Sequence, residues 1–248
     1  MIVGILMFAD KRYLTGQDDQ FIDRATVSAG IHRQALAAFL ALQHAAAESF
    51  ELTIASGYRD FNRQLAIWNG KATGERPVLD KQGRVIDIST LDPWSLVQAI
   101  LRWSALPGAS RHHWGTDIDV YDKRAVKADY QLQLSLEEVS GSGPFVALHE
   151  WLDEQILRGA SFGFFRPYQI DSGGIAPERW HLSYLPLAQQ YQRELSLDYL
   201  RDTIAAQPIA LKQVVLANLE EIYHRYIVVE EKLYPTKLVN TQKMKAYD

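Results

Sequence analysis

The order of patterns along the chain is compatible with an α+β fold, with helices first, strands in the middle and helices again at the end. Apolar residues recur at helical spacing between residues 31 and 50, and they alternate with polar residues between residues 116 and 121. From Leu187 onward the pattern changes to one of helices. The chain has 248 residues, the size of one large domain or of one domain with an appendage.

Patterns in the first half of the chain favour a leading strand, two amphipathic helices and a hairpin. The apolar run within residues 1–10 is typical of a first strand or a core-facing segment, and it is too short to cross a membrane. Residues 31–50 are expected to form a long helix, with Ser28 as its cap. Further expected elements are a strand at 52–55, a helix through 65–68 that Ser56 or Asp60 caps, a hairpin over 77–86 with its tip at 80–83, and a helix over 93–103 that Asp92 caps.

The second half contains a strand with one apolar and one acidic face. Residues 116–121 alternate, which places Ile118 and Val120 together on one face. Asp117 and Asp119 then share the opposite face. Other expected elements are alternating residues at 131–136, a helix at 145–157, and strands at 162–165 and 180–184.

Beyond the last of these strands we expect a second unit. Residues 1–189 are predicted to form the main domain, and residues 190–248 a mostly helical C-terminal appendage packed on it. In the appendage we expect helices at 196–206 and 208–226 and a strand at 227–229. No residue pattern there suggests chemistry, so its expected role is packing or dimerisation.

Composition excludes several classes of protein. The chain contains no cysteine, which excludes disulfides, thiolate nucleophiles and cysteine-based metal sites. Any metal site must therefore use His, Asp and Glu. With 26 Lys and Arg against 30 Asp and Glu, the net charge of −4 gives no reason to expect a nucleic-acid partner. We expect no membrane span and no signal peptide, so the cytoplasm is the default location and the periplasm stays open.

Two segments carry side chains suited to metal-dependent hydrolysis. His112 and Asp119 lie in a loop and on the strand after it, and Gly115 allows a tight turn between them. Glu178 and His181 are three residues apart. Two imidazoles and one carboxylate leave a zinc position open for water, whose pKa the ion lowers to roughly 7. A carboxylate outside the ligand set, such as Glu178, can then carry the proton to a leaving amine. Either pair alone is better explained as a satisfied hydrogen-bonding pair or a solvated face than as part of a catalytic site.

Three motifs, taken together, resemble those of a known family. They are Ser56-Gly57-Tyr58-Arg59, Ser110-x-His112-x-x-Gly115-x-x-x-Asp119 and Glu178-x-Trp180-His181. Over about residues 50–185 the chain resembles the M15 family of zinc D-Ala-D-Ala carboxypeptidases, and within it the VanY-type branch, subfamily M15B. The resemblance implies an α+β fold of the Hedgehog/DD-peptidase type, with a small, mostly antiparallel sheet flanked by helices.

The resemblance also implies an activity and a metal site. His112, Asp119 and His181 match the family's ligands of one Zn²⁺ ion, and Glu178 matches its general base. The implied enzyme is a D-alanyl-D-alanine carboxypeptidase. In it, zinc-bound water attacks the terminal peptide bond of a peptidoglycan stem peptide, or of a precursor, that ends in D-Ala.

Three further residues match the family near its substrate. Arg59 matches an arginine that stabilises the tetrahedral intermediate or holds the substrate carboxylate, and a planar, bidentate guanidinium suits both tasks. Gln64 falls where the family often has a glutamine on the same helix. Ser110 is expected to contact the substrate or to orient its loop.

Some residues depart from the family pattern or leave a choice. Asp117 stands where the family often has a small residue. It would either orient His112 or His181, or face solvent or an arginine. Arg179, inside the third motif, is expected to be exposed. The motif register favours His112 over its neighbour His113 as the ligand.

Two other functions stay open at this point. The motifs define chemistry rather than subsites, so an L,D-carboxypeptidase or an endopeptidase acting on the same peptides would carry the same residues. A zinc site can also be structural in a non-catalytic binding module, as in Hedgehog-like relatives of this fold. Glu178 favours catalysis, because a binding module needs no proton carrier.

Overall fold

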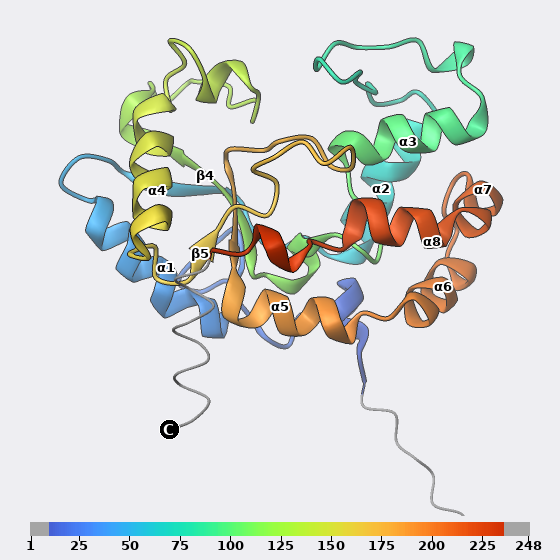
Figure 1. Cartoon of the computed structure of the whole chain (residues 1–248), viewed down its shortest axis with the longest axis horizontal. Coiled ribbons are helices and arrows are strands. Elements are labelled where there is room, and N and C mark those ends of the chain that lie inside the picture. The colour runs from blue at the N-terminus through green and yellow to red at the C-terminus, as the bar shows by residue number, and fades with distance from the viewer. Residues whose placement is uncertain (1–9, 236–248) are drawn as a thin grey trace, which may run out of the picture.

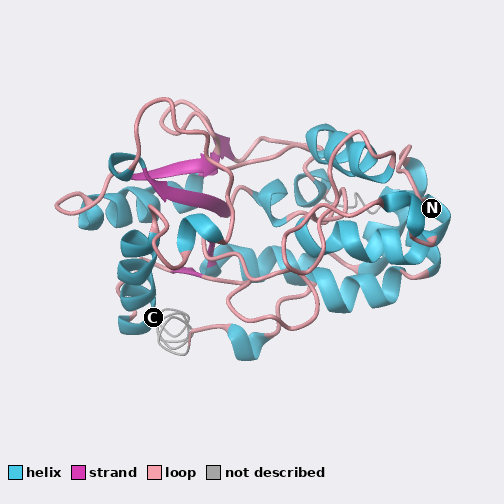
Figure 2. Cartoon of the chain, turned by 90° about the horizontal axis from the view of Figure 1, so that it is seen from above, coloured by secondary structure: helices cyan, strands magenta, loops and turns pink. Residues whose placement is uncertain are grey.

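A computed structural model describes residues 10–235 and shows a small sheet among helices (Figure 1). The sheet contains, in spatial order, β3 (Leu52–Ser56), β4 (Asp117–Asp122), β6 (His181–Tyr184) and β5 (Phe164–Phe165). Each neighbouring pair is antiparallel. Two short strands, β1 (Ile22–Asp23) and β2 (Ile31–His32), pair separately. Figure 2 shows the strands gathered in one part of the molecule with helices around them. The fold is α+β, as the sequence predicts.

The register of the sheet brings polar residues from three strands together. Asp119 on β4 is the cross-strand partner of His181 on β6 and of Ser56 on β3. Partners in antiparallel strands have Cβ atoms about 4.5–5.5 Å apart. Backbone pairing alone therefore sets Asp119 beside His181.

Helices α1 (Arg33–Ala46) and α4 (Val146–Arg158) pack with the apolar face of the sheet. Ile118 and Val120 are fully buried there, which confirms the alternation predicted for this strand. Their cluster includes two residues of each helix: Phe39, Leu42, Leu148 and Leu152. The other face of β4 carries Asp117, Asp119 and Tyr121.

A second hydrophobic cluster joins the remaining helices. These are α2 (Phe61–Ala72), α3 (Pro93–Trp103), α5 (Leu185–Glu194), α6 (Leu197–Ala206), α7 (Lys212–Ala217) and α8 (Leu219–Ile222). The cluster contains buried residues from before and after residue 190, among them Trp68, Ile100, Leu200, Ile204 and Ile222. The C-terminal helices thus share a core with α2 and α3. A division into residues 1–189 and 190–248 stays a prediction.

Helix caps agree with the sequence at two positions and differ at one. Asp60 accepts a hydrogen bond from the backbone N–H of the third residue of α2, and Asp92 does the same for two residues of α3. The prediction of Ser28 as a cap is wrong. His32 directly precedes α1, and its Nδ1 accepts from the backbone N–H of Gln34 at 3.1 Å.

Residues 131–136 form no strand, contrary to the predicted alternation. Glu138 accounts for this, since its carboxylate accepts from the backbone N–H of Gln133 at 3.0 Å and of Ser135 at 3.1 Å. The chain is thereby curled around one side chain, and Leu134 takes a φ of 53°. The buried Glu138 carboxylate thus occupies backbone N–H groups that would otherwise bond to a neighbouring strand.

The C-terminal elements also differ from the prediction. The helix expected over 208–226 begins at Lys212, breaks at Asn218 and ends in a π-helical turn at Tyr223–Ile227. The strand expected at 227–229 is absent from the described chain. Instead, the backbone N–H and carbonyl oxygen of Val229 both form hydrogen bonds with the side-chain amide of Gln192.

Within residues 10–235, none of the helices has the length and apolar character needed to cross a membrane. The first strand predicted within residues 1–10 lies almost wholly outside the described residues. The same holds for residues 236–248 of the predicted appendage.

Candidate metal centre and active-site pocket

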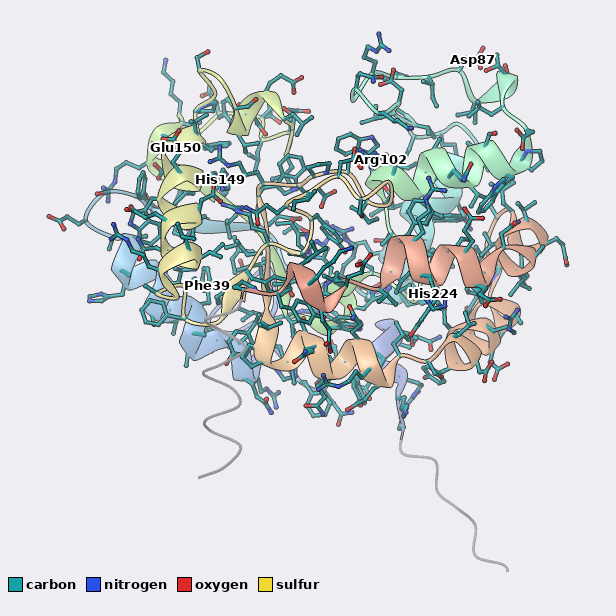
Figure 3. All side chains as sticks on the ribbon, viewed as in Figure 1. Phe39, Asp87, Arg102, His149, Glu150 and His224 are labelled. Atoms are coloured by element: carbon teal, nitrogen blue, oxygen red, sulfur yellow. The ribbon has the colours of Figure 1, made fainter. Side chains whose placement is uncertain are left out.

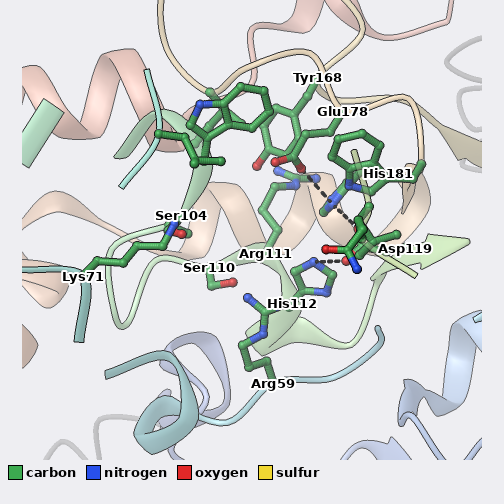
Figure 4. A pocket seen from close by; sticks show the side chains of 17 residues that line it. Arg59, Lys71, Ser104, Ser110, Arg111, His112, Asp119, Tyr168, Glu178 and His181 are labelled. Atoms are coloured by element: carbon green, nitrogen blue, oxygen red, sulfur yellow. Dashed lines mark hydrogen bonds and ion pairs between the residues drawn. The ribbon is translucent and has the colours of Figure 1, made fainter. Parts of the chain in front are cut away.

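Three side chains converge on the polar side of the sheet. His112 lies on the 3-10 turn Arg111–Trp114, Asp119 on β4 and His181 at the start of β6. One ligand atom from each lies within 4.8 Å of the others. His112 Nε2 is 3.3 Å and His181 Nδ1 is 3.1 Å from the Asp119 carboxylate. All three residues are buried, and Figure 4 shows them facing one another.

Two glycines allow His112 to reach this position. Gly115 ends the 3-10 turn with a φ of 65°, and a Cβ there would meet the backbone nitrogen of His32 at 2.9 Å. At Gly57 a Cβ would meet the carbonyl oxygen of Gly30 at only 2.2 Å. Gly57 can therefore pack closely, and its own carbonyl oxygen lies 2.9 Å from His112 Nδ1. The first and second motifs thus meet at this histidine.

The hydrogen-bond partners assign the histidine protons. A carbonyl oxygen only accepts, so His112 Nδ1 must donate to Gly57, and the His112 Nε2 that faces Asp119 is its basic nitrogen. His181 faces a carboxylate with each nitrogen, Asp117 at 3.0 Å from Nε2 and Asp119 at 3.1 Å from Nδ1. Burial lowers the pKa of His181, but these two carboxylates outweigh it and raise the pKa to about 10. A cation bound at Nδ1 would replace the proton there and leave Nε2–H to donate to Asp117. When both rings are neutral, two nitrogen lone pairs and a carboxylate point at each other. This donor set fits a cation and leaves a tetrahedral position open.

Asp117 resolves the choice left by the sequence, because it pairs with an arginine and also contacts a histidine of the group. Its Oδ1 lies 2.8 Å from Arg111 Nε and 3.0 Å from His181 Nε2. Its Oδ2 accepts from Thr116 Oγ1 at 2.6 Å. Burial alone would raise the pKa of Asp117, but Arg111 and His181 hold it well below its usual range. Asp117 thus remains a carboxylate, although it is fully buried near Asp119.

Glu178 lies beside the three-residue group and outside it. Its Oε2 is 3.7 Å from His181 Nδ1. A tight turn holds it there: Glu178 N donates to the carbonyl oxygen of Tyr168 at 3.0 Å, and His181 N donates to that of Glu178 at 3.1 Å. Burial raises the pKa of Glu178 to about 7, even though His181 opposes the shift. A carboxyl group of this kind can accept and release a proton near neutral pH.

Arg59 brings a positive charge that has no carboxylate partner. Its guanidinium donates to Ser56 Oγ at 3.1 Å and to Gln64 Oε1 at 2.9 Å. Its buried Nε has no hydrogen-bond partner, and no described carboxylate lies within ion-pair distance. Burial lowers the pKa of Arg59, while Asp119 opposes the shift. An anionic group in the pocket would complete the coordination of this side chain.

Of the two remaining predicted residues, one lines the pocket and one supports it. Ser110 lies on the pocket wall beside His112. Gln64 is fully buried and does not line the pocket, because its amide binds Arg59 on one side and donates to the carbonyl oxygen of Ala105 at 2.7 Å on the other. Its position makes Gln64 a residue that orients Arg59.

The pocket over this group has a volume of about 280 Å³. Among the polar lining residues that the sequence motifs do not predict are Lys71 and Tyr168 (Figure 4). The side-chain ammonium of Lys71 forms no hydrogen bond or ion pair with any described residue, and burial lowers its pKa. Helical spacing could have predicted Lys71, because it lies seven residues after Gln64 and therefore on the same face of α2.

Other candidates lie apart from the group. His113 turns away, with Nδ1 at 2.6 Å from the Arg59 carbonyl oxygen and Nε2 accepting from the backbone of Gly108. Arg179 is half-buried rather than exposed, because it binds the Asp153 carboxylate and the Val139 carbonyl oxygen. Two further histidines, His149 on α4 and His224 on the π-helical turn, do not line the pocket (Figure 3).

A sheet that holds a His–Asp–His group beside a buried glutamate and an unpaired arginine is the arrangement of a metal-dependent hydrolase. Residues 28–187 match the family model VanY, D-alanyl-D-alanine carboxypeptidase. Since this range covers more than half of the chain, the protein belongs to the VanY family and is a peptidase of that family.

Two proteins of Haemophilus influenzae, both described as uncharacterized, are similar in sequence. One is 47% identical over 98 residues, which is 38% of this chain and 67% of the relative. The other is 33% identical over 125 residues, which is 50% of this chain and 93% of the relative. A solved structure of VanYB in complex with D-alanine-D-alanine is 22% identical, covers 73% of this chain and 88% of its own, and has a TM-score of 0.47.

Proposed function

We propose that this protein is a zinc-dependent D-alanyl-D-alanine carboxypeptidase that removes the terminal D-alanine of peptidoglycan stem peptides or their precursors. The observation that carries the proposal is the convergence of His112 Nε2, His181 Nδ1 and the Asp119 carboxylate beside Glu178. Membership of the VanY family supports the same bond specificity. Two nitrogens and one carboxylate suit Zn²⁺ and leave room for water and substrate.

Zinc at this position supplies Lewis-acid chemistry, since it lowers the pKa of a water molecule and polarises the peptide carbonyl. Glu178 takes the proton of the attacking water and returns it to the leaving amine of D-alanine. Arg59 neutralises negative charge, either on the carbonyl oxygen during the reaction or on the terminal carboxylate of the bound peptide. Ser110 contributes a hydroxyl to the same wall.

The proposal is tested by incubating the protein with defined muropeptides, with and without a chelator, and weighing the products. We expect D-alanine to be released from a pentapeptide, and we expect the chelator to stop the release. D-alanine from a tetrapeptide alone would identify an L,D-carboxypeptidase, and cleavage inside the stem would identify an endopeptidase. Zinc binding without any cleavage would identify a binding module and contradict the proposal.

We expect Lys71→Met to raise KM for stem peptides about fivefold, with kcat and zinc content within about twofold of the unsubstituted protein. Lys71 has no acidic partner among the described residues, so a free carboxylate of the peptide can pair with it. Steady-state kinetics on matched peptides with free and amidated carboxylates measure the effect. The exposed Lys127→Met is the control. An equal rise in KM for both peptides would disprove this role.

We expect Asp117→Asn to weaken zinc binding by about 10- to 100-fold. The amide loses the charge that pairs with Arg111 and holds the proton on His181 Nε2. Competition with a chromophoric chelator measures the dissociation constant on the folded, metal-free protein. Asp129→Asn, at an exposed position, is the control. A dissociation constant within twofold of the unsubstituted protein would contradict this prediction.

A further inference from the structure

The segment 229–234 lies beside the sheet although it follows α8 and the π-helical turn Tyr223–Ile227 in the described part of the chain. Val229 and Tyr234 form a buried cluster with Phe165 of β5 and Leu185 of α5. The rings of Phe165 and Tyr234 meet edge to face, 5.4 Å between centroids. This segment lies beyond residues 28–187, which match the family. Its packing places it next to β5, which pairs with the strand β6 that carries His181 (Figure 1).

One side chain connects this segment to the interior. Gln192 on α5 donates through Nε2 to the carbonyl oxygen of Val229 at 3.0 Å and to Tyr234 Oη at 3.3 Å. Its Oε1 accepts from the backbone N–H of Val229 at 2.9 Å. The same Oε1 also accepts from Arg111 Nη1 at 3.2 Å. Gln192 therefore holds the segment with one side and Arg111 with the other.

Arg111 connects Gln192 to Asp117, because it donates hydrogen bonds to both. Its side chain is only 3% exposed, and its three nitrogens bind three different partners. Nε donates to Asp117, Nη2 donates to Ser183 Oγ at 2.8 Å, and Nη1 donates to Gln192. Asp117 in turn faces His181 Nε2 at 3.0 Å. A planar guanidinium held at all three nitrogens has one orientation, and this orientation fixes the carboxylate that accepts the hydrogen bond from His181 Nε2–H.

We propose that Gln192 is a positioning residue through which the segment 229–234 strengthens metal binding at His181. This inference rests on the proposed function only in assuming that His112, Asp119 and His181 bind zinc. Without Gln192, Arg111 Nη1 loses its partner, and only Nε and Nη2 still hold the guanidinium. Asp117 is then positioned less firmly, and its hydrogen bond with His181 Nε2–H, which leaves Nδ1 for the metal, is weakened.

The test measures zinc affinity of the full-length, metal-free protein by competition with a chromophoric chelator. Gln192→Met keeps the length of the side chain and removes its hydrogen bonds. We expect it to raise the zinc dissociation constant about tenfold. Gln190→Met, an exposed glutamine on the same helix, is the matched control and is expected to change nothing. Circular dichroism of the metal-free proteins confirms that each is folded at the assay temperature.

A double-mutant cycle separates positioning from a general loss of stability. If Gln192 acts through Arg111 and Asp117, Gln192→Met should have little further effect on zinc affinity in an Asp117→Asn protein. Additive losses, or a Gln192→Met protein that binds zinc like the control, would overturn the inference. If Gln192→Met or Asp117→Asn does not fold, Gln192→Asn and Arg111→Lys provide the same cycle. Failure of the unsubstituted protein to bind zinc would instead refute the proposed function.

Discussion

Replacing Glu178 with glutamine is expected to lower kcat for D-alanine release by about a thousandfold. Glutamine has nearly the same shape but cannot accept the proton of the attacking water. The site predicts that only this step is lost, because Glu178 lies 3.7 Å from His181 and outside the three-residue group. Zinc content should therefore remain at one ion per chain.

The measurement combines steady-state kinetics on a pentapeptide with metal analysis of the same sample. Glu150→Gln, on the exposed side of α4, is the matched control and should behave like the unsubstituted protein (Figure 3). A Glu178→Gln protein that keeps its zinc and hydrolyses at an unchanged rate would remove Glu178 from the mechanism. Loss of zinc together with activity would show that Glu178 supports metal binding.

Replacing Arg59 with lysine is expected to lower kcat/KM by about a hundredfold. Lysine keeps the positive charge but lacks the planar guanidinium of Arg59. That guanidinium donates to Ser56 and Gln64, and its Nε has no partner among the described residues. The charge would therefore no longer be held in one orientation toward the pocket.

The kinetic split decides between the two roles of Arg59. A loss in kcat alone identifies stabilisation of the oxyanion, whereas a rise in KM identifies binding of the terminal carboxylate. Arg63→Lys, exposed on the same helix, is the control. A change of less than about threefold in kcat/KM would show that the bidentate geometry of Arg59 has no part in the reaction.

The sequence predicts the helices and the centre of the sheet because local signals decide them. Asp60 and Asp92 mark helix starts, and the alternation around Ile118 marks a buried face. Prediction fails where a distant or unexpected side chain takes the backbone hydrogen bonds. Glu138 does so at residues 131–136, and Gln192 does so at Val229.

The same distinction applies to the candidate site. His112, Asp119 and His181 were predicted from motifs, and the structure places them together. The contacts around them join residues far apart in the sequence, such as Arg111 and Gln192. No local sequence pattern predicts a hydrogen bond between two such residues. Lys71 was missed because its meaning depends on the pocket that other elements build around it.

The pairing of Asp119 with His181 has a consequence for how the protein tolerates metal scarcity. Backbone hydrogen bonds between β4 and β6 set these two side chains in register whether or not an ion is bound. The fold therefore forms the metal site before the ion binds, and folding does not depend on the ion. Stripping the ion should leave far-ultraviolet circular dichroism unchanged, and returning zinc should restore activity without refolding.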